Sequence, residues 1–200
     1  MERARLLAGG SDGNRRLTAA TAVVLTVLLI AEGLTIVGGI RHLLTPHVFI
    51  GLALIPPILL KLASTGWRMV SYYRRVDEYV RRGPPATLQR MLVAPILVAA
   101  TVVLFVSGIV AVWVGHGGMW LGLHKASFVV WGIAFGIHFL AHALKVPRAV
   151  EIDWWHPDLL RGRRIRQYVL AGAVVAGFVV ALAAFPLAHH WHPGFDFAGG

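Results

Sequence analysis

The sequence contains no cysteine. This absence excludes disulfide bonds, cysteine-ligated iron–sulfur clusters and covalent haem attachment through a Cys-x-x-Cys-His motif. Charge is also scarce, because only 14% of the 200 residues are Asp, Glu, Lys or Arg, and just nine of these are acidic. Soluble domains carry about 25% charged residues. The composition therefore argues against an ordinary soluble fold.

The sequence instead contains long apolar stretches. Hydrophobic residues make up 57% of the chain, and a membrane-spanning helix needs about 20 mostly apolar residues. Five stretches qualify, at residues 17–40, 45–66, 91–114, 120–146 and 168–188. Because lipid satisfies no backbone polar group, such stretches cross a bilayer as helices. The sequence predicts an all-α integral membrane helical bundle with five transmembrane helices, forming a single domain over residues 1–200.

The positive charges are unevenly distributed among the predicted loops. Arginines gather before the first stretch, between the second and third, and between the fourth and fifth, whereas the other side holds only Arg41 and Lys125. By the positive-inside rule, this indicates a multi-pass protein of the inner (plasma) membrane, with a cytoplasmic N-terminus and the C-terminus outside. The basic loops then face anionic lipid rather than nucleic acid. Residues 1–16 are expected to form a cytoplasmic tail and residues 149–166 an interfacial segment.

Four ionisable residues stand out inside the apolar stretches. His47 and Lys61 lie fourteen residues apart in the second stretch, and His124 and His138 have the same separation in the fourth. In an α-helix this spacing returns to within about 40° of the same face and rises about 21 Å. Because the two helices run in the same direction, His47 is expected at the depth of His124, and Lys61 at the depth of His138. Ionisable groups in hydrocarbon are costly, so these positions suggest function.

Two histidines that face each other from adjacent helices are suited to bind a haem iron from both sides. Gly51 lies one turn from His47, and Ser107-Gly108 lies on the third helix; such small residues let a flat ring approach the backbone. The same residues also serve ordinary helix packing. The sequence therefore predicts a metal site in which His47 and His124 bind the iron of a non-covalent haem, with His138 as a further iron ligand.

This arrangement resembles that of the bacterial membrane b-type cytochromes of the cytochrome b561 and ferric-reductase-like superfamily. The resemblance rests on the thirteen-residue interval between His124 and His138, facing His47, and covers residues 17–146. It implies that the first four helices form a haem-binding bundle with one haem b and room for a second. It further implies one-electron transfer with a quinone or another redox partner, and a partner enzyme at one membrane face.

Lys61 departs from the family pattern, because a second histidine would stand there in a two-haem bundle. Lys61 either ligates the iron of an inner haem as a neutral amine, pairs with a haem propionate, or reaches toward the cytoplasmic interface while the inner haem is absent. Arg41 and Arg90, at opposite ends of the bundle, are candidates for propionate pairing, although arginines there ordinarily contact lipid headgroups. Glu32 is a candidate proton relay or quinol-binding group, or a neutral acid hydrogen-bonded across helices.

Two further classes of function stay open at this point. The chain is alternatively a haem-free membrane anchor or assembly subunit, its histidines hydrogen-bonded between helices. A proton-coupled transporter using Glu32, Lys61 and His138 is the other alternative, which the lack of an internal repeat disfavours. Whether the chain is the oxidoreductase subunit of an enzyme is not decided by these residues.

Overall fold

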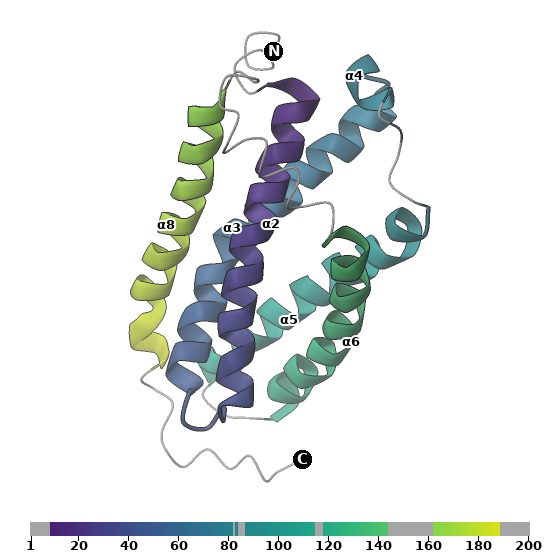
Figure 1. Ribbon diagram of the computed structural model, residues 1–200. Helices are drawn as coiled ribbons and strands as arrows, with labels where there is room; N and C mark the ends of the chain where they lie inside the picture. The colour runs from purple at the N-terminus through teal and green to yellow at the C-terminus, as the bar shows by residue number, and fades with distance from the viewer. Residues whose placement is uncertain (1–8, 82, 84–86, 115–117, 144–161, 189–200) are drawn as a thin grey trace. The chain divides into compact units, whose positions relative to one another are not determined.

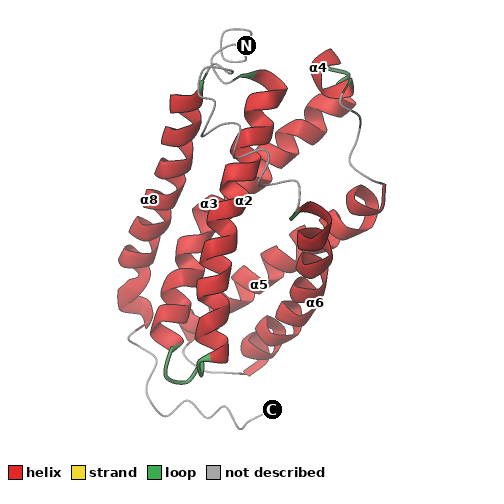
Figure 2. Ribbon diagram, in the orientation of Figure 1, coloured by secondary structure: helices red, strands yellow, loops and turns green. Residues whose placement is uncertain are grey.

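The computed structural model describes residues 9–81, 83, 87–114, 118–143 and 162–188 of the 200-residue chain (Figure 1). All regular structure in these ranges is helical (Figure 2). The helices are α2 (Gly10–Val37), α3 (Leu44–Tyr73), the short α4 (Asp77–Val80), the π-helical η1 (Gln89–Val93), which continues into α5 (Ala94–Val114), then α6 (Gly118–His142) and α8 (Arg163–Ala188). The predicted all-α class is confirmed.

Five helices in the described ranges are long and apolar enough to cross a membrane: α2, α3, η1 with α5, α6 and α8. They coincide with the five predicted stretches, so the chain is a multi-pass membrane protein. Their outer faces carry large exposed apolar side chains, such as Val27, Ile30 and Leu34 of α2. Lipid tails accept such surfaces, whereas in water they would promote aggregation.

The first helix begins earlier than the sequence predicted. α2 starts at Gly10, so residues 10–16 of the expected tail are helical, while their position in the cytoplasm stays a prediction. Glu78 of α4 explains the early start, because its Oε1 accepts the backbone N–H of Ser11 at 2.7 Å. A carboxylate there satisfies an unpaired amide and interacts favourably with the helix dipole. This contact joins residues 67 positions apart, which no local pattern reveals.

The described helices belong to two compact units. The first covers residues 1–84 and 143–183 and holds α2, α3, α4 and most of α8; the second covers residues 85–142 and 184–200 and holds η1, α5 and α6. Assembly of the first four helices into one bundle, within one domain, stays a prediction. Of the predicted interfacial segment, residues 149–161 lie outside the described ranges, and residues 163–166 form the first turn of α8.

In the first unit, a proline pair creates the contact between α3 and α8. α3 runs as one helix through Pro56-Pro57, and because proline has no N–H, Pro57 leaves the Ala53 carbonyl without its usual intrahelical donor. A Cβ built on Gly177 of α8 would collide with this carbonyl oxygen. The α-hydrogen of the glycine faces the oxygen instead, a C–H···O contact of the kind found where helices approach closely.

In the second unit, α5 and α6 pack along each other, and α6 carries an aromatic stack that is bonded to α5 through Trp131. Trp131 of α6 donates its indole N–H to the hydroxyl of Thr101 on α5 at 3.1 Å. Phe135 stacks on Trp131, with ring centroids 4.7 Å apart and planes inclined by 7°. Phe128 and Phe139 extend the stack in both directions along α6. Three of these rings lie between His124 and His138, and Phe139 directly follows His138.

The α3–α8 contact can be tested by adding one methyl group. Gly177→Ala should lower the free energy of unfolding by roughly 1–3 kcal/mol, the usual cost of overpacking a close contact. Gly172→Ala on the same helix is the matched control, since its Cβ would meet no atom within 4 Å. This control should be neutral or slightly stabilising, because alanine favours helix over glycine. Denaturant unfolding in detergent micelles measures both, and equal stability of the two variants would contradict the contact.

Candidate functional site

His47, near the start of α3, is held by two residues of α2. Its Nδ1 lies 3.0 Å from Oε1 of Glu32 and 3.0 Å from Oγ1 of Thr35. The Thr35 hydroxyl donates its hydrogen to the Glu32 carbonyl oxygen at 2.6 Å, so toward the imidazole it acts as an acceptor. Nδ1 of His47 therefore carries a hydrogen and donates to both oxygens. In the neutral ring, this leaves the lone pair on Nε2.

Glu32 is itself largely buried, with 15% of its side chain exposed. Gly51 of α3 lies beside this carboxylate, since a Cβ there would be in van der Waals contact with Glu32 Oε1 at 3.4 Å. The glycine that the sequence assigned to a haem surface thus borders the carboxylate of Glu32. The second carboxylate oxygen, Oε2, is buried and has no hydrogen-bond partner among the described residues. Buried polar oxygens normally have a hydrogen-bond donor, so Oε2 is open to an additional one.

His124 of α6 is fixed in the same way in the second unit. Its Nδ1 lies 2.9 Å from the Leu104 carbonyl oxygen of α5. A carbonyl can only accept, so Nδ1 again carries the hydrogen. A Cβ on Gly108 would lie 2.9 Å from the ring atoms Cε1 and Nδ1. Gly108 therefore makes room for the imidazole itself, whereas the sequence had suggested a flat surface for a cofactor at Ser107-Gly108.

The two histidines share one tautomer, with hydrogen on Nδ1. Metal-ligating histidines almost always donate their other ring N–H to a carboxylate, carbonyl or water, which fixes the ring and raises the basicity of the ligating nitrogen. His47 and His124 belong to different units, so their pairing across one iron stays a prediction. Among the described residues, no three or more His, Cys, Asp or Glu side chains gather into a metal site. Bis-histidine haem needs only two protein ligands.

At the other end of α6, His138 lies near the start of the third span. Its Nδ1 is 3.3 Å from Oε1 of Gln89 on η1. The ring also stacks on His142, with centroids 4.5 Å apart, and His142 Nδ1 donates to the His138 carbonyl oxygen at 2.9 Å. Arg90 follows Gln89, and its Nε is buried without a hydrogen-bond partner among the described residues. Gln89 was not predicted from the sequence as a neighbour of His138, whereas His142 lies one helical turn after it.

Lys61 makes a contact that none of the three sequence-based alternatives included. Its Nζ donates to the Thr18 carbonyl oxygen of α2 at 2.8 Å. The Thr18 hydroxyl lies 2.9 Å from Ser64 Oγ, and the Asn14 side-chain amide donates to the Ser64 carbonyl at 2.9 Å. These bonds connect α2 and α3 at the end opposite to His47. The i, i+4 spacing of Asn14 and Thr18 was the signal in the sequence that could have indicated a polar face there.

The remaining predicted residue, Arg41, lies exposed in the turn between α2 and α3. This turn immediately precedes the helix that carries His47. Thr35 was not predicted, although its position three residues after Glu32 places both side chains on one helix face. Within the first unit, the structure therefore brings together His47, Glu32, Thr35 and Gly51, while Lys61 joins a separate network.

The close fit of His124 against α5 gives a direct test. Gly108→Ala should displace the imidazole and weaken its bond to the Leu104 carbonyl, lowering the free energy of unfolding by roughly 1–3 kcal/mol. Gly132→Ala in the same unit is the control, because its Cβ would meet nothing within 4 Å. Thermal unfolding in detergent compares the two. Identical midpoints would show that the ring does not rest on Gly108.

None of the protein-family models, curated proteins and solved structures compared with the chain matches it. The resemblance to b-type cytochromes that the histidine positions suggest therefore stays a prediction.

Proposed function

We propose that the protein is a membrane b-type cytochrome that passes electrons between the quinone pool, or another redox partner, and an acceptor through non-covalent haem b. The observation that carries this proposal is that His47 and His124 have the same tautomer, with the hydrogen on Nδ1. Both imidazoles donate from Nδ1 to an acceptor on the neighbouring helix, and both lie on helices apolar enough to span a bilayer.

The chemistry of the two rings fits axial haem ligation. An iron-binding imidazole presents one nitrogen lone pair, and a hydrogen bond from the other nitrogen holds the ring in place. Glu32 and Thr35 supply this bond for His47, and the Leu104 carbonyl supplies it for His124. A bound haem would provide reversible one-electron chemistry. The apolar helices would exclude water from the ligands.

We propose a single haem at this outer position. Lys61 is engaged with the Thr18 carbonyl, and His138 interacts with Gln89 and His142, so each inner residue has a local role without a second haem. The distribution of arginines supports an orientation in the inner membrane with the N-terminus in the cytoplasm. The partnerless oxygen of Glu32 makes this residue the candidate to hold a proton during oxidation of a quinol.

A second function is favoured by the same hydrogen bonds. His47 links α3 to α2, and His124 links α6 to α5, so both histidines also act as interhelical cross-links. A haem-free anchor or assembly subunit of a larger complex would need nothing more from them. The two functions differ in one measurable property, the haem content of the purified protein.

Haem content is therefore the first experiment. The full-length protein, purified in mild detergent, should give about one haem per chain in a pyridine haemochrome assay, because one pair of imidazoles binds one iron. His47→Ala and His124→Ala should each lose most of this haem. His42→Ala, an exposed histidine in the turn before α3, is the matched control and should keep it.

Two outcomes would contradict the proposal. Wild-type protein without haem, expressed with sufficient haem supply, would exclude the cytochrome and favour the anchor subunit. Full haem content in either the His47 or the His124 variant would refute this pair as the ligands.

The role of Glu32 gives a second test by redox titration. Glu32→Gln should retain haem, because an amide oxygen still accepts the His47 N–H. The neutral acceptor makes the imidazole a weaker donor to ferric iron, so the midpoint potential should rise by tens of millivolts, with about 59 mV corresponding to a tenfold change in a one-electron equilibrium. Thr26→Val, which removes a hydroxyl bonded to its own helix, is the control. An unchanged potential in the Glu32 variant would contradict the contact with His47.

A further inference from the structure

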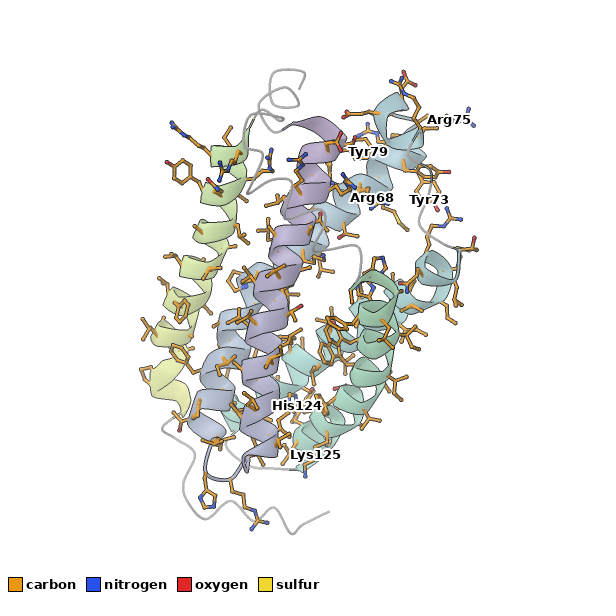
Figure 3. All side chains as sticks on the ribbon, viewed as in Figure 1. Arg68, Tyr73, Arg75, Tyr79, His124 and Lys125 are labelled. Carbon is orange, nitrogen blue, oxygen red and sulfur yellow. The ribbon has the colours of Figure 1, made fainter. Side chains whose placement is uncertain are left out.

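A cleft lies in the first unit, where α2 begins and α3 approaches α4. It has a volume of about 240 Å³ and is lined by Ser11, Arg15, Arg68 and Tyr79. Figure 3 shows Arg68 and Tyr79 at this end of the unit. A water molecule occupies about 30 Å³ in the liquid. The cleft is therefore large enough for a phosphate-sized group.

Ser11 indicates that the cleft holds a polar ligand. Its residue surface is 4% exposed, and its hydroxyl oxygen has no hydrogen-bond partner among the described residues. The backbone N–H of the same residue already donates to Glu78. The hydroxyl is thus the group of Ser11 that can bind a ligand in the cleft. Buried hydroxyls normally have partners, so an unpartnered one that lines a cleft indicates a ligand acceptor or donor.

The cleft contains side chains of the kind that bind anions. Two guanidinium groups, of Arg15 and Arg68, line it. Two carboxylates lie close by. The carboxylate of Glu78 accepts the backbone N–H of Ser11, and Oδ1 of Asp12 lies 3.6 Å from a guanidinium nitrogen of Arg15. The Arg15–Asp12 pair is about half exposed on the arginine side and long, so it is weak and an incoming anion can replace it. Guanidinium groups bind phosphate through paired hydrogen bonds.

The neighbouring side chains indicate that the anion belongs to a lipid. Trp67 precedes Arg68 and is 49% exposed, and Tyr73 at the end of α3 is 59% exposed. Exposed Trp and Tyr at the end of a membrane-spanning helix are typical of the headgroup region of a bilayer. The apolar part of α3 continues directly from this point. The acyl chains of a lipid whose headgroup lies in the cleft can therefore extend along the apolar part of α3.

From these observations we propose that the cleft binds the phosphate of an anionic phospholipid headgroup. Arg15 and Arg68 contact the phosphate oxygens, and the Ser11 hydroxyl donates a hydrogen bond to one of them. This site is independent of the haem proposal, because it shares no residue with the histidine sites.

The experiment uses full-length protein, stripped of lipid in a neutral detergent, and titrates phosphatidylglycerol while native mass spectrometry counts bound lipid. One saturable site is expected. Arg68→Gln should weaken binding about tenfold, the ratio expected for one lost charge-assisted hydrogen bond. Ser11→Ala should weaken it about threefold, as for a neutral hydrogen bond. Arg74→Gln removes an equal charge from the exposed end of α3, outside the cleft, and should change affinity less than twofold.

Two probes distinguish the source of the phosphate. Phosphatidylcholine, whose headgroup has no net charge, should bind more weakly than phosphatidylglycerol. Inorganic phosphate should not displace phosphatidylglycerol at millimolar concentration, and displacement there would overturn the lipid assignment in favour of a soluble phosphate.

The variants decide whether the site is specific. If Arg68→Gln and Arg74→Gln weakened phosphatidylglycerol binding equally and Ser11→Ala had no effect on it, the proposal would be overturned. The protein would then attract anionic lipid only diffusely. Arg15→Gln provides a second substitution at an exposed position should the buried Ser11 variant fail to fold. It should weaken phosphatidylglycerol binding like Arg68→Gln, and unchanged affinity in both arginine variants would also overturn the site.

Discussion

Polar groups inside the apolar helices must find their partners within the protein, because hydrocarbon offers none. Apart from Oε2 of Glu32 and some groups near the ends of the spans, the polar side chains of the described spans considered above meet this constraint in two ways. Thr21 and Ser107, both nearly inaccessible, bond to carbonyls of their own helices. His47, Lys61 and His124 bond to a neighbouring helix instead. These ionisable residues therefore help to fix which faces of α2 and α3, and of α5 and α6, meet.

The same constraint shapes the chemistry of the imidazoles. An acceptor that fixes the hydrogen on Nδ1 also fixes the lone pair on Nε2, so a bond that joins two helices prepares a metal ligand. For His47 the acceptor is a carboxylate, and for His124 it is a backbone carbonyl. A structural role and a ligand role are thus compatible in the same residue. The two proposed functions, cytochrome and anchor subunit, therefore require the same contacts and differ only in whether haem is bound.

Small residues and prolines set the distances at which these contacts form. Gly108 leaves space that the ring of His124 fills, and Gly177 approaches a carbonyl that Pro57 has deprived of its donor. Neither glycine needs an unusual backbone conformation; each is required by what lies opposite. The small residues let the helices approach closely, and the hydrogen bonds between side chains and neighbouring helices need this short distance. The cleft with Ser11 and Arg68 follows different rules, because at the end of the spans water and headgroups compete with the protein.

The membrane class, the five spans and the few ionisable positions worth attention were predictable from the sequence, because the length of an apolar run and the cost of a charge in lipid are local properties. The sequence could not identify the partners. Glu32 with His47, Lys61 with the Thr18 carbonyl, and Glu78 with the start of α2 join residues 15, 43 and 67 positions apart. These pairs became apparent in the tertiary structure, because they depend on which helix faces pack together. Helical periodicity shows which residues share one face, but it does not show which helix packs against that face.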